Sequence, residues 1–533
     1  MGEMEVKPEA AKRKYLFSFS RPFLLFIFYS ALALGSLAFA ALSFVNFQRD
    51  VRGVESVRRT APLALGVNTD LEQYQTRDQI RKGLLYVKIA GLTTIRQHFS
   101  WRAIETTPGV YDWTKYDQMV EVAGSLNLDI LPVLDTTPPF YQRDYERLNP
   151  HAPPDDFARF AKFAGDFAAR YQFHQYEVWD QPNVYPNWGE RNSNPVEYAR
   201  LLEAASASLR ARDPVAEIII GGLAMNLEKE RDKRNYSEVL FLRGLYDAGA
   251  AKDFDAVGAK PYGLWTGPED RRVSLDVLDF SRVILLREEM RVHNDTRPIL
   301  GVEFGWNALP PDWHGNPSPW GSDTPETQSA RTQAAVARVR DEWAWMPSLY
   351  AAAFQPNAAS DDPRWGLALL NEQGEPTTLY GSFARLNGQA LLPGPASNSM
   401  LFYLALGVLV AAAVVAGWRA SVVAARLPLR EMWNAVSQRF NAAPEFAQFA
   451  ALALAVGAFY FAPHTDLSFV LLLAVLCLFT LRLDLGLVIT VFTIPFYLAP
   501  KILFSGFALS LNEVLTLVGV GAFVIQKLFQ SQT

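Results

Sequence analysis

The chain has a single cysteine, Cys477, among its 533 residues, and only six histidines. One cysteine excludes intrachain disulfides and the paired Cys-x-x-Cys clusters of structural zinc sites. No His-Glu-x-x-His or similar spacing occurs, so we expect no metal and no cofactor. The formal net charge is only −5 and no segment concentrates basic residues, which argues against a nucleic-acid partner.

Long apolar runs, in contrast, are present near both ends. Residues 22–45 form an uncharged run that can cross a hydrocarbon core of about 30 Å. The run is longer than the core of a signal peptide, roughly 7–15 residues, and no small-x-small cleavage site follows it, so we predict an uncleaved anchor with a signal peptide as the alternative. Residues 1–21 are basic, and the positive-inside rule places this tail in the cytoplasm.

Residues 391–399 form a Pro/Gly/Ser linker, and residues 400–533 are predicted to be a multi-span membrane domain. Its apolar segments lie near 400–418, 446–463, 467–481, 485–499 and 507–526. The loop after the first segment carries Arg419, Arg426, Arg430 and Arg439 and is therefore assigned to the cytoplasm. We expect about five C-terminal spans, a multi-pass plasma-membrane protein in contact with membrane lipids, and an extracytoplasmic domain between the anchors.

Residues 60–390 alternate short apolar runs with amphipathic stretches of helical length, as repeated βα units do. The pattern predicts an α/β domain with the (β/α)8 TIM barrel fold. The alternative is an open doubly wound sheet. The sequence has no Gly-rich phosphate loop after the first strand, which argues against it. The eight strand candidates are residues 63–67, 94–97, 129–134, 175–179, 217–221, 254–258, 298–302 and 349–354.

Active sites of such barrels form at the C-terminal ends of the strands. The residues at these predicted ends are Arg96, His98, Asp135, Asp180, Gln181, Lys260, Tyr262 and Glu303. The domain also holds all of the 13 tryptophans except Trp418 and Trp433. Tryptophan faces stack on sugar rings, so Trp101 and Trp306 join the candidate substrate-binding residues, with ordinary core packing as the alternative.

Four segments of this domain resemble clan A glycoside hydrolases, in particular the β-xylosidase and cellulase-like families. Residues 176–183, Y-E-V-W-D-Q-P-N, are similar to their fourth-strand W-N-E-P-N motif. Residues 95–113 look like the second-strand segment, and residues 302–306, V-E-F-G-W, match the seventh-strand nucleophile motif. Trp365-Gly-Leu, followed by Gly374-Glu-Pro, resembles the closing segment. The resemblance implies a carbohydrate ligand, with Glu303 at the nucleophile position.

The chain departs from that motif at its catalytic acid. The position of the acid is held by Gln181, and an amide neither donates the required proton nor activates water. Asp180 replaces the asparagine that precedes the acid, and Lys260 stands where the family tends to have histidine. Asp180 could replace the acid only if a bulge or a shifted substrate turned it into the site, because adjacent strand residues point to opposite sides.

Three functions therefore stay open: a glycoside hydrolase-like protein acting on or binding envelope or extracellular polysaccharide, a non-catalytic glycan-binding scaffold, and a retaining transferase with an activated lipid-linked donor. Residues 445–530 are in addition similar to the N-terminal helices of O-antigen ligase-like membrane proteins. That resemblance implies polysaccharide-assembly membrane proteins as partners, and a generic anchor bundle is the alternative.

Overall fold

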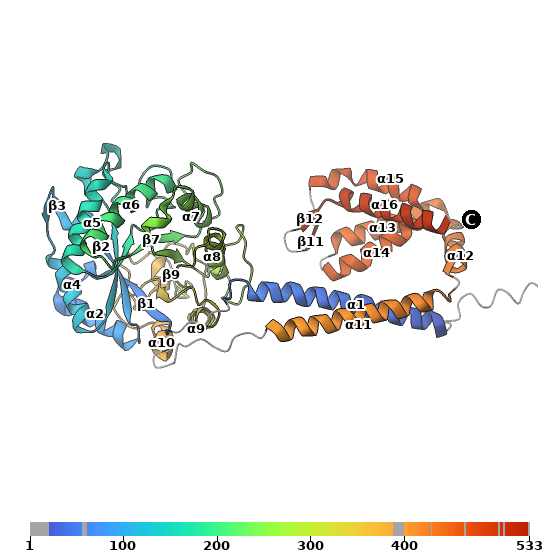
Figure 1. Ribbon diagram of the computed structural model, residues 1–533, viewed down its shortest axis with the longest axis horizontal. Coiled ribbons are helices and arrows are strands. Elements are labelled where there is room, and N and C mark those ends of the chain that lie inside the picture. Colours follow the sequence, from blue (N-terminus) through green and yellow to red (C-terminus); the bar gives the residue numbers. More distant parts are fainter. Residues whose placement is uncertain are drawn as a thin grey trace, which may run out of the picture. The chain divides into compact units, whose positions relative to one another are not determined.

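The computed structural model describes residues 21–55, 61–386, 399–427, 429–462, 465–498, 501–504 and 507–530 (Figure 1). The chain divides into two compact units, Ser43–Met400 and the combination of Met1–Leu42 with Leu401–Thr533. The predicted cytoplasmic tail, apart from Arg21, and the predicted linker, apart from Ser399, lie outside the described residues.

The first unit is a closed barrel of eight parallel strands in the order β1-β10-β9-β8-β7-β6-β5-β2. This closed parallel ring confirms the predicted (β/α)8 fold. Each predicted strand overlaps an observed one. The strands are β1 (Ala64–Thr69), β2 (Thr94–Ser100), β5 (Asp129–Asp135), β6 (Gln175–Val178), β7 (Glu217–Ala224), β8 (Ala256–Lys260), β9 (Ile299–Phe304) and β10 (Ser348–Ala351).

Helices surround the ring in the first unit, as Figure 1 shows. They are α2 (Arg77–Ile89), α3 (Trp101–Ile104), α4 (Thr114–Ser125), α5 (Phe157–Tyr171), α6 (Pro195–Arg212), α7 (Glu238–Asp247), α8 (Val283–Val292), α9 (Pro325–Glu342) and α10 (Thr378–Leu386). A short hairpin of β3 (Glu105–Thr107) and β4 (Val110–Tyr111) follows α3.

Local sequence explains why these helices form where they do. Helix α2 starts with a capping box in which Thr76 and Gln79 satisfy each other's backbone N–H groups. Helix α5 starts at Asp156, whose side chain accepts from the Ala158 backbone, and its Phe160, Phe163 and Phe167 recur on helical spacing and are fully buried. The apolar stripes of the helices thus cover the outside of the ring.

The interior of the barrel is filled by its own side chains rather than open. Leu131, Ile219, Leu300, Val302 and Tyr350 form a buried cluster contributed by four strands and lying inside the ring. This apolar layer closes the inside of the ring, and the charged side chains described below lie in a separate cluster.

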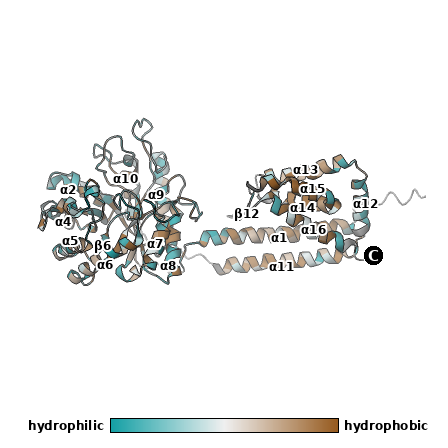
Figure 2. Ribbon diagram, turned by 90° about the horizontal axis from the view of Figure 1, so that it is seen from above, coloured by the Kyte–Doolittle hydropathy of each residue, from teal (hydrophilic) through white to brown (hydrophobic). Residues whose placement is uncertain are grey.

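The second unit is helical. It contains α1 (Arg21–Val51) up to Leu42, α11 (Ser399–Ala424) from Leu401 on, α12 (Leu429–Asn441), α13 (Glu445–Phe461), α14 (Thr465–Leu481), α15 (Leu483–Phe492), α16 (Leu511–Gln530) and a hairpin of β11 (Lys501–Phe504) and β12 (Phe507–Leu509). Leu452, Phe459, Phe479, Ile489 and Leu515 belong to a buried core shared by α13 to α16. Figure 2 shows hydrophobic residues along these helices and more hydrophilic ones on α12.

Two of the described helices, Arg21–Val51 and Met400–Ala424, are long and apolar enough to cross a membrane. A third span results if Trp433–Asn441 and Glu445–Phe461, bent by 113°, count as one. Helix α13 has 17 residues, about 26 Å at 1.5 Å per residue, which falls short of a hydrocarbon core of about 30 Å. The predicted five C-terminal spans are thus found as apolar helices, but their number as spans is not confirmed.

Candidate carbohydrate site

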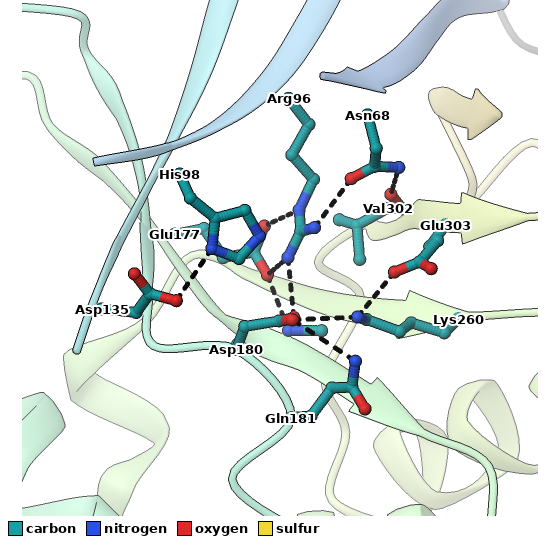
Figure 3. Close-up of polar contacts among 12 residues, drawn as sticks. Asn68, Arg96, His98, Asp135, Glu177, Asp180, Gln181, Lys260, Val302 and Glu303 are labelled. Atoms are coloured by element: carbon teal, nitrogen blue, oxygen red, sulfur yellow. Dashed lines mark hydrogen bonds and ion pairs between the residues drawn. The ribbon is translucent and has the colours of Figure 1, made fainter. Parts of the chain in front are cut away.

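The C-terminal ends of β2, β6, β8 and β9 bring charged side chains together at one mouth of the barrel (Figure 3). Arg96 on β2 is almost fully buried and donates two hydrogen bonds of 2.7 Å to the buried Glu177 on β6. It also donates to Asn68 at 2.8 Å and to Asp180 at 2.7 Å. Two buried partners and a rigid guanidinium fork hold the strand ends in register.

Lys260, at the end of β8, contacts carboxylates from two other strand ends, Asp180 after β6 and Glu303 on β9. Its Nζ lies 3.0 Å from Oδ2 of Asp180 and 2.6 Å from Oε2 of Glu303. The Lys260 side chain is 3% exposed and that of Glu303 is 20% exposed. Tyr262 donates its hydroxyl proton to the other carboxylate oxygen of Glu303. The carboxylate at the expected nucleophile position is therefore held by an ammonium and a phenol.

The backbone at the end of β6 differs from the extended form assumed from the sequence. The strand ends at Val178, and both Trp179 (φ 70°) and Gln181 (φ 51°) lie in the left-handed region. Such values are uncommon for residues other than glycine and are typical of functional sites. In this backbone conformation the side chains of Asp180 and Gln181 lie together. The Gln181 amide N–H donates to the Asp180 carboxylate at 3.4 Å.

The charge state of Asp180 bears on whether it can act as an acid. Burial by itself raises the pKa of this carboxyl, but the cations Lys260, Arg96 and His98 outweigh it and hold the pKa below the ordinary value. Asp180 is therefore a carboxylate at neutral pH and has no proton to deliver. Asp180 is thus not suited to serve as a general acid at neutral pH.

His98 and Asp135 form a second polar pair at the ends of β2 and β5. The His98 Nδ1 lies 2.8 Å from an oxygen of Asp135, whose side chain is 1% exposed, whereas that of His98 is 34% exposed. Burial lowers the pKa of the imidazole, but the Asp135 carboxylate raises it to about 9. His98 is consequently a cation at neutral pH with one ring edge toward solvent.

The expected roles of Trp101 and Trp306 as sugar platforms are corrected by the structure, because both side chains are fully buried. Trp101 packs against Tyr141, Phe160 and Phe163 and donates its indole N–H to Glu105 at 2.6 Å. Trp306 donates its N–H to the Thr266 carbonyl at 2.6 Å. The residue type alone does not show whether a tryptophan stacks on a sugar or packs in the core.

Sequence reasoning missed two residues of this cluster, Glu177 and Asn68. Glu177 is a charged residue in the middle of an apolar strand, and a buried charge requires a partner. That signal was visible in Tyr-Glu-Val-Trp. Asn68, on β1, donates to the Val302 and Ala351 carbonyls at 2.9 Å and gave no comparable signal.

Metal ions in proteins are held by groups of His, Cys, Asp or Glu side chains that lie close together. Among the residues that the structure describes, no group of three or more His, Cys, Asp or Glu is placed to hold a metal ion. The carboxylates at the mouth are instead occupied by Arg96, Lys260 and His98.

No protein-family model matches the chain, and no curated protein matches its sequence. Solved structures are similar to it. A family 39 glycoside hydrolase from Bacteroides cellulosilyticus has 17% identity and a TM-score of 0.46, and the alignment covers 61% of this chain and 63% of that one. A monomeric β-xylosidase from Caulobacter crescentus has 18% identity and a TM-score of 0.46, with 63% and 71% covered. An exo-β-1,4-mannosidase from an Opitutaceae bacterium has 16% identity and a TM-score of 0.41, with 65% and 63% covered.

Proposed function

We propose that this protein is a membrane-anchored, glycoside hydrolase-like barrel that binds a cell-envelope or extracellular polysaccharide without cleaving it. The observation that carries the proposal is the position of Lys260 between Asp180 and Glu303. Retaining glycosidases need one carboxylate to attack the anomeric carbon and one carboxylic acid to protonate the leaving oxygen. Here both roles are impaired.

The first impaired role is that of the acid, which would protonate the leaving oxygen. Gln181 has no acidic proton, and the pKa of Asp180 is held low by Lys260 and Arg96 despite its burial. Losing a general acid typically costs about 10²–10⁴ in rate. Cleavage of an ordinary glycoside is therefore expected to be slow.

The second impaired role is that of the nucleophile, which would attack the anomeric carbon. The transition state of glycoside cleavage has oxocarbenium character, so a carboxylate beside it must be free to stabilise positive charge. An ammonium 2.6 Å from Glu303 neutralises that carboxylate and repels the developing cation. The same arrangement still suits binding, because amide, carboxylate and imidazole groups can hydrogen-bond to sugar hydroxyls.

Membrane attachment is supported by the two apolar helices that are long enough to span a bilayer. An extracytoplasmic barrel, a multi-pass membrane half and polysaccharide-assembly partners remain part of the proposal. The similarity of residues 445–530 to O-antigen ligase-like helices stays a prediction.

A glycan array probed with the full chain in nanodiscs, together with a panel of aryl glycosides, tests the proposal. We expect retention of defined glycans and no release of aryl alcohol. Glu303→Ala should weaken the retention at least about tenfold, the loss of one hydrogen bond to a charged group. Turnover of an aryl glycoside by the unaltered protein that disappears in Glu303→Gln would show that the barrel is an enzyme.

A further inference from the structure

The loop after β8 carries an exposed tryptophan that the buried residues beneath it hold in place. Gly263 packs directly on Trp306, since a Cβ at this position would lie 1.8 Å from Cε2 of the indole. The Trp306 N–H binds the Thr266 carbonyl, and the Gly263 N–H binds the Gly305 carbonyl at 3.2 Å. Trp265, between these fixed points, is 64% exposed.

A second tryptophan approaches from the loop between β9 and α9. The ring of Trp320 stacks on Tyr262 with centroids 6.3 Å apart and an interplanar angle of 28°. Trp320 is only partly buried, and it packs against the cluster of Tyr262, Leu264, Ala352 and Leu367. Tyr262 in turn donates to Glu303, so Trp320 is one aromatic contact away from the central carboxylate.

The two loops are in close contact with each other. Gly321 has φ 87°, and a Cβ there would lie 2.7 Å from the Leu264 carbonyl oxygen and 3.4 Å from Cδ1 of Trp265. Only glycine adopts this conformation at so short a distance without strain. The loops that carry Trp320 and Trp265 are thus packed against each other, and Trp320 is connected to Glu303 through Tyr262.

We propose that Trp320 and Trp265 form a second sugar-binding subsite, which stacks on a ring of the same polysaccharide beyond the ring held at Glu303. Tryptophan supplies a large apolar face with a polar edge, which matches the face of a pyranose and its hydroxyl rim. An indole with most of its surface in solvent, on a loop fixed from below, is suited to such a contact. The proposal rests on the proposed function and adds to it that the ligand is an extended chain.

Length dependence of binding tests this subsite. Full-length protein in nanodiscs is applied to a glycan array that carries defined oligosaccharides of one to eight residues. The double variant Trp265→Ala/Trp320→Ala should bind glycans of four or more residues at least about tenfold more weakly, a loss equivalent to roughly 1.4 kcal/mol, and should bind mono- and disaccharides as the unaltered protein does. Thermal unfolding of each variant reports whether the fold is retained.

Tyr145→Ala is the matched control, since Tyr145 is a 63% exposed ring in the segment after β5, four strands away from β9 around the ring. It should leave the binding of long glycans unchanged. Unchanged binding of long glycans by the tryptophan variants, or an equal loss in Tyr145→Ala, would overturn the subsite while leaving the proposed function intact. Failure of the unaltered protein to retain any glycan would remove the proposed function and, with it, the subsite.

Discussion

Lys260 and Glu303 form a shielded ion pair at the mouth of the barrel, with Nζ of the lysine 2.6 Å from Oε2 of the carboxylate. The lysine side chain is 3% exposed. An ion pair out of water is strong because little solvent screens it, and removing one partner leaves the other charge uncompensated. The pair therefore sets what chemistry the neighbouring side chains can perform.

A carboxyl at position 181 alone should not produce glycoside cleavage. Gln181→Glu places a carboxyl beside Asp180 but leaves Lys260 paired with both Asp180 and Glu303, so we expect aryl glycoside hydrolysis close to background. Gln181→Glu combined with Lys260→His removes the lysine amine from Glu303 and should raise the initial rate by about 10²–10⁴, the usual contribution of a general acid. Release of aryl alcohol measures both. An equal gain from Gln181→Glu alone would show that Lys260 does not block the reaction.

The Arg96–Glu177 pair should matter for folding far more than a surface pair does. Arg96→Met leaves two buried carboxylates without their shared cation, and we expect a loss of about 3–5 kcal/mol in the free energy of unfolding. Arg77→Met is the matched control, because the Arg77 and Glu121 side chains are 54% and 61% exposed. It should cost at most about 1 kcal/mol. Chemical denaturation of the two variants gives the comparison, and similar losses would contradict it.

His98 should make the stability of the barrel depend on alkaline pH. Burial lowers the pKa of His98 but Asp135 raises it to about 9, and the unfolded value is about 6.5. The pair thus contributes its full stabilisation below about pH 6.5 and loses it as the pH rises through 9. Since 34% of the imidazole side chain is exposed, solvent screening limits the contribution to on the order of 1–2 kcal/mol.

Denaturation at pH 6 and pH 9.5 measures this effect. Asp135→Asn should destabilise the protein at pH 6, and the gap to the unaltered protein should narrow by about that amount at pH 9.5. A gap that is independent of pH would refute the charged pair.

Substitution of two glycines by alanine should change the stability of the barrel in opposite directions. Gly263→Ala forces a methyl group into Trp306, 1.8 Å from Cε2, and overpacking of this kind costs about 1–3 kcal/mol. Gly124→Ala, in α4 with nothing within 4 Å of the new methyl group, should be neutral or stabilise by up to about 1 kcal/mol. Thermal unfolding distinguishes them, and a tolerated Gly263→Ala would show that the Trp306 support is dispensable.

Membrane topology can be read with single cysteines in a Cys477→Ser background. Leu148→Cys is in the barrel, where Leu148 is 98% exposed, and should react with an impermeant maleimide added outside spheroplasts. Gln438→Cys on α12 should react only after permeabilisation, because Gln438 lies within the basic segment that is assigned to the cytoplasm. The reverse pattern would overturn the proposed orientation.

The barrel was predictable from the sequence because apolar strands and amphipathic helices alternate in it, and the observed strands overlap all eight candidates. The strand-end rule also found Arg96, Asp180, Lys260 and Glu303, which the structure brings together. The left-handed backbone of Trp179 and Gln181 was not predictable, because neither residue type favours it and the surrounding fold imposes it. Burial of Trp101 and Trp306 likewise depends on tertiary packing that spacing along one strand does not encode.

The closed ring of strands also limits how copies of this protein can associate. β1 is hydrogen-bonded to β10 on one side and to β2 on the other, so the ring has no unpaired strand edge. Open edges are the usual templates for strand-by-strand growth between chains. The barrel is thereby protected from strand-by-strand aggregation, and assembly through this unit must use its side-chain surfaces.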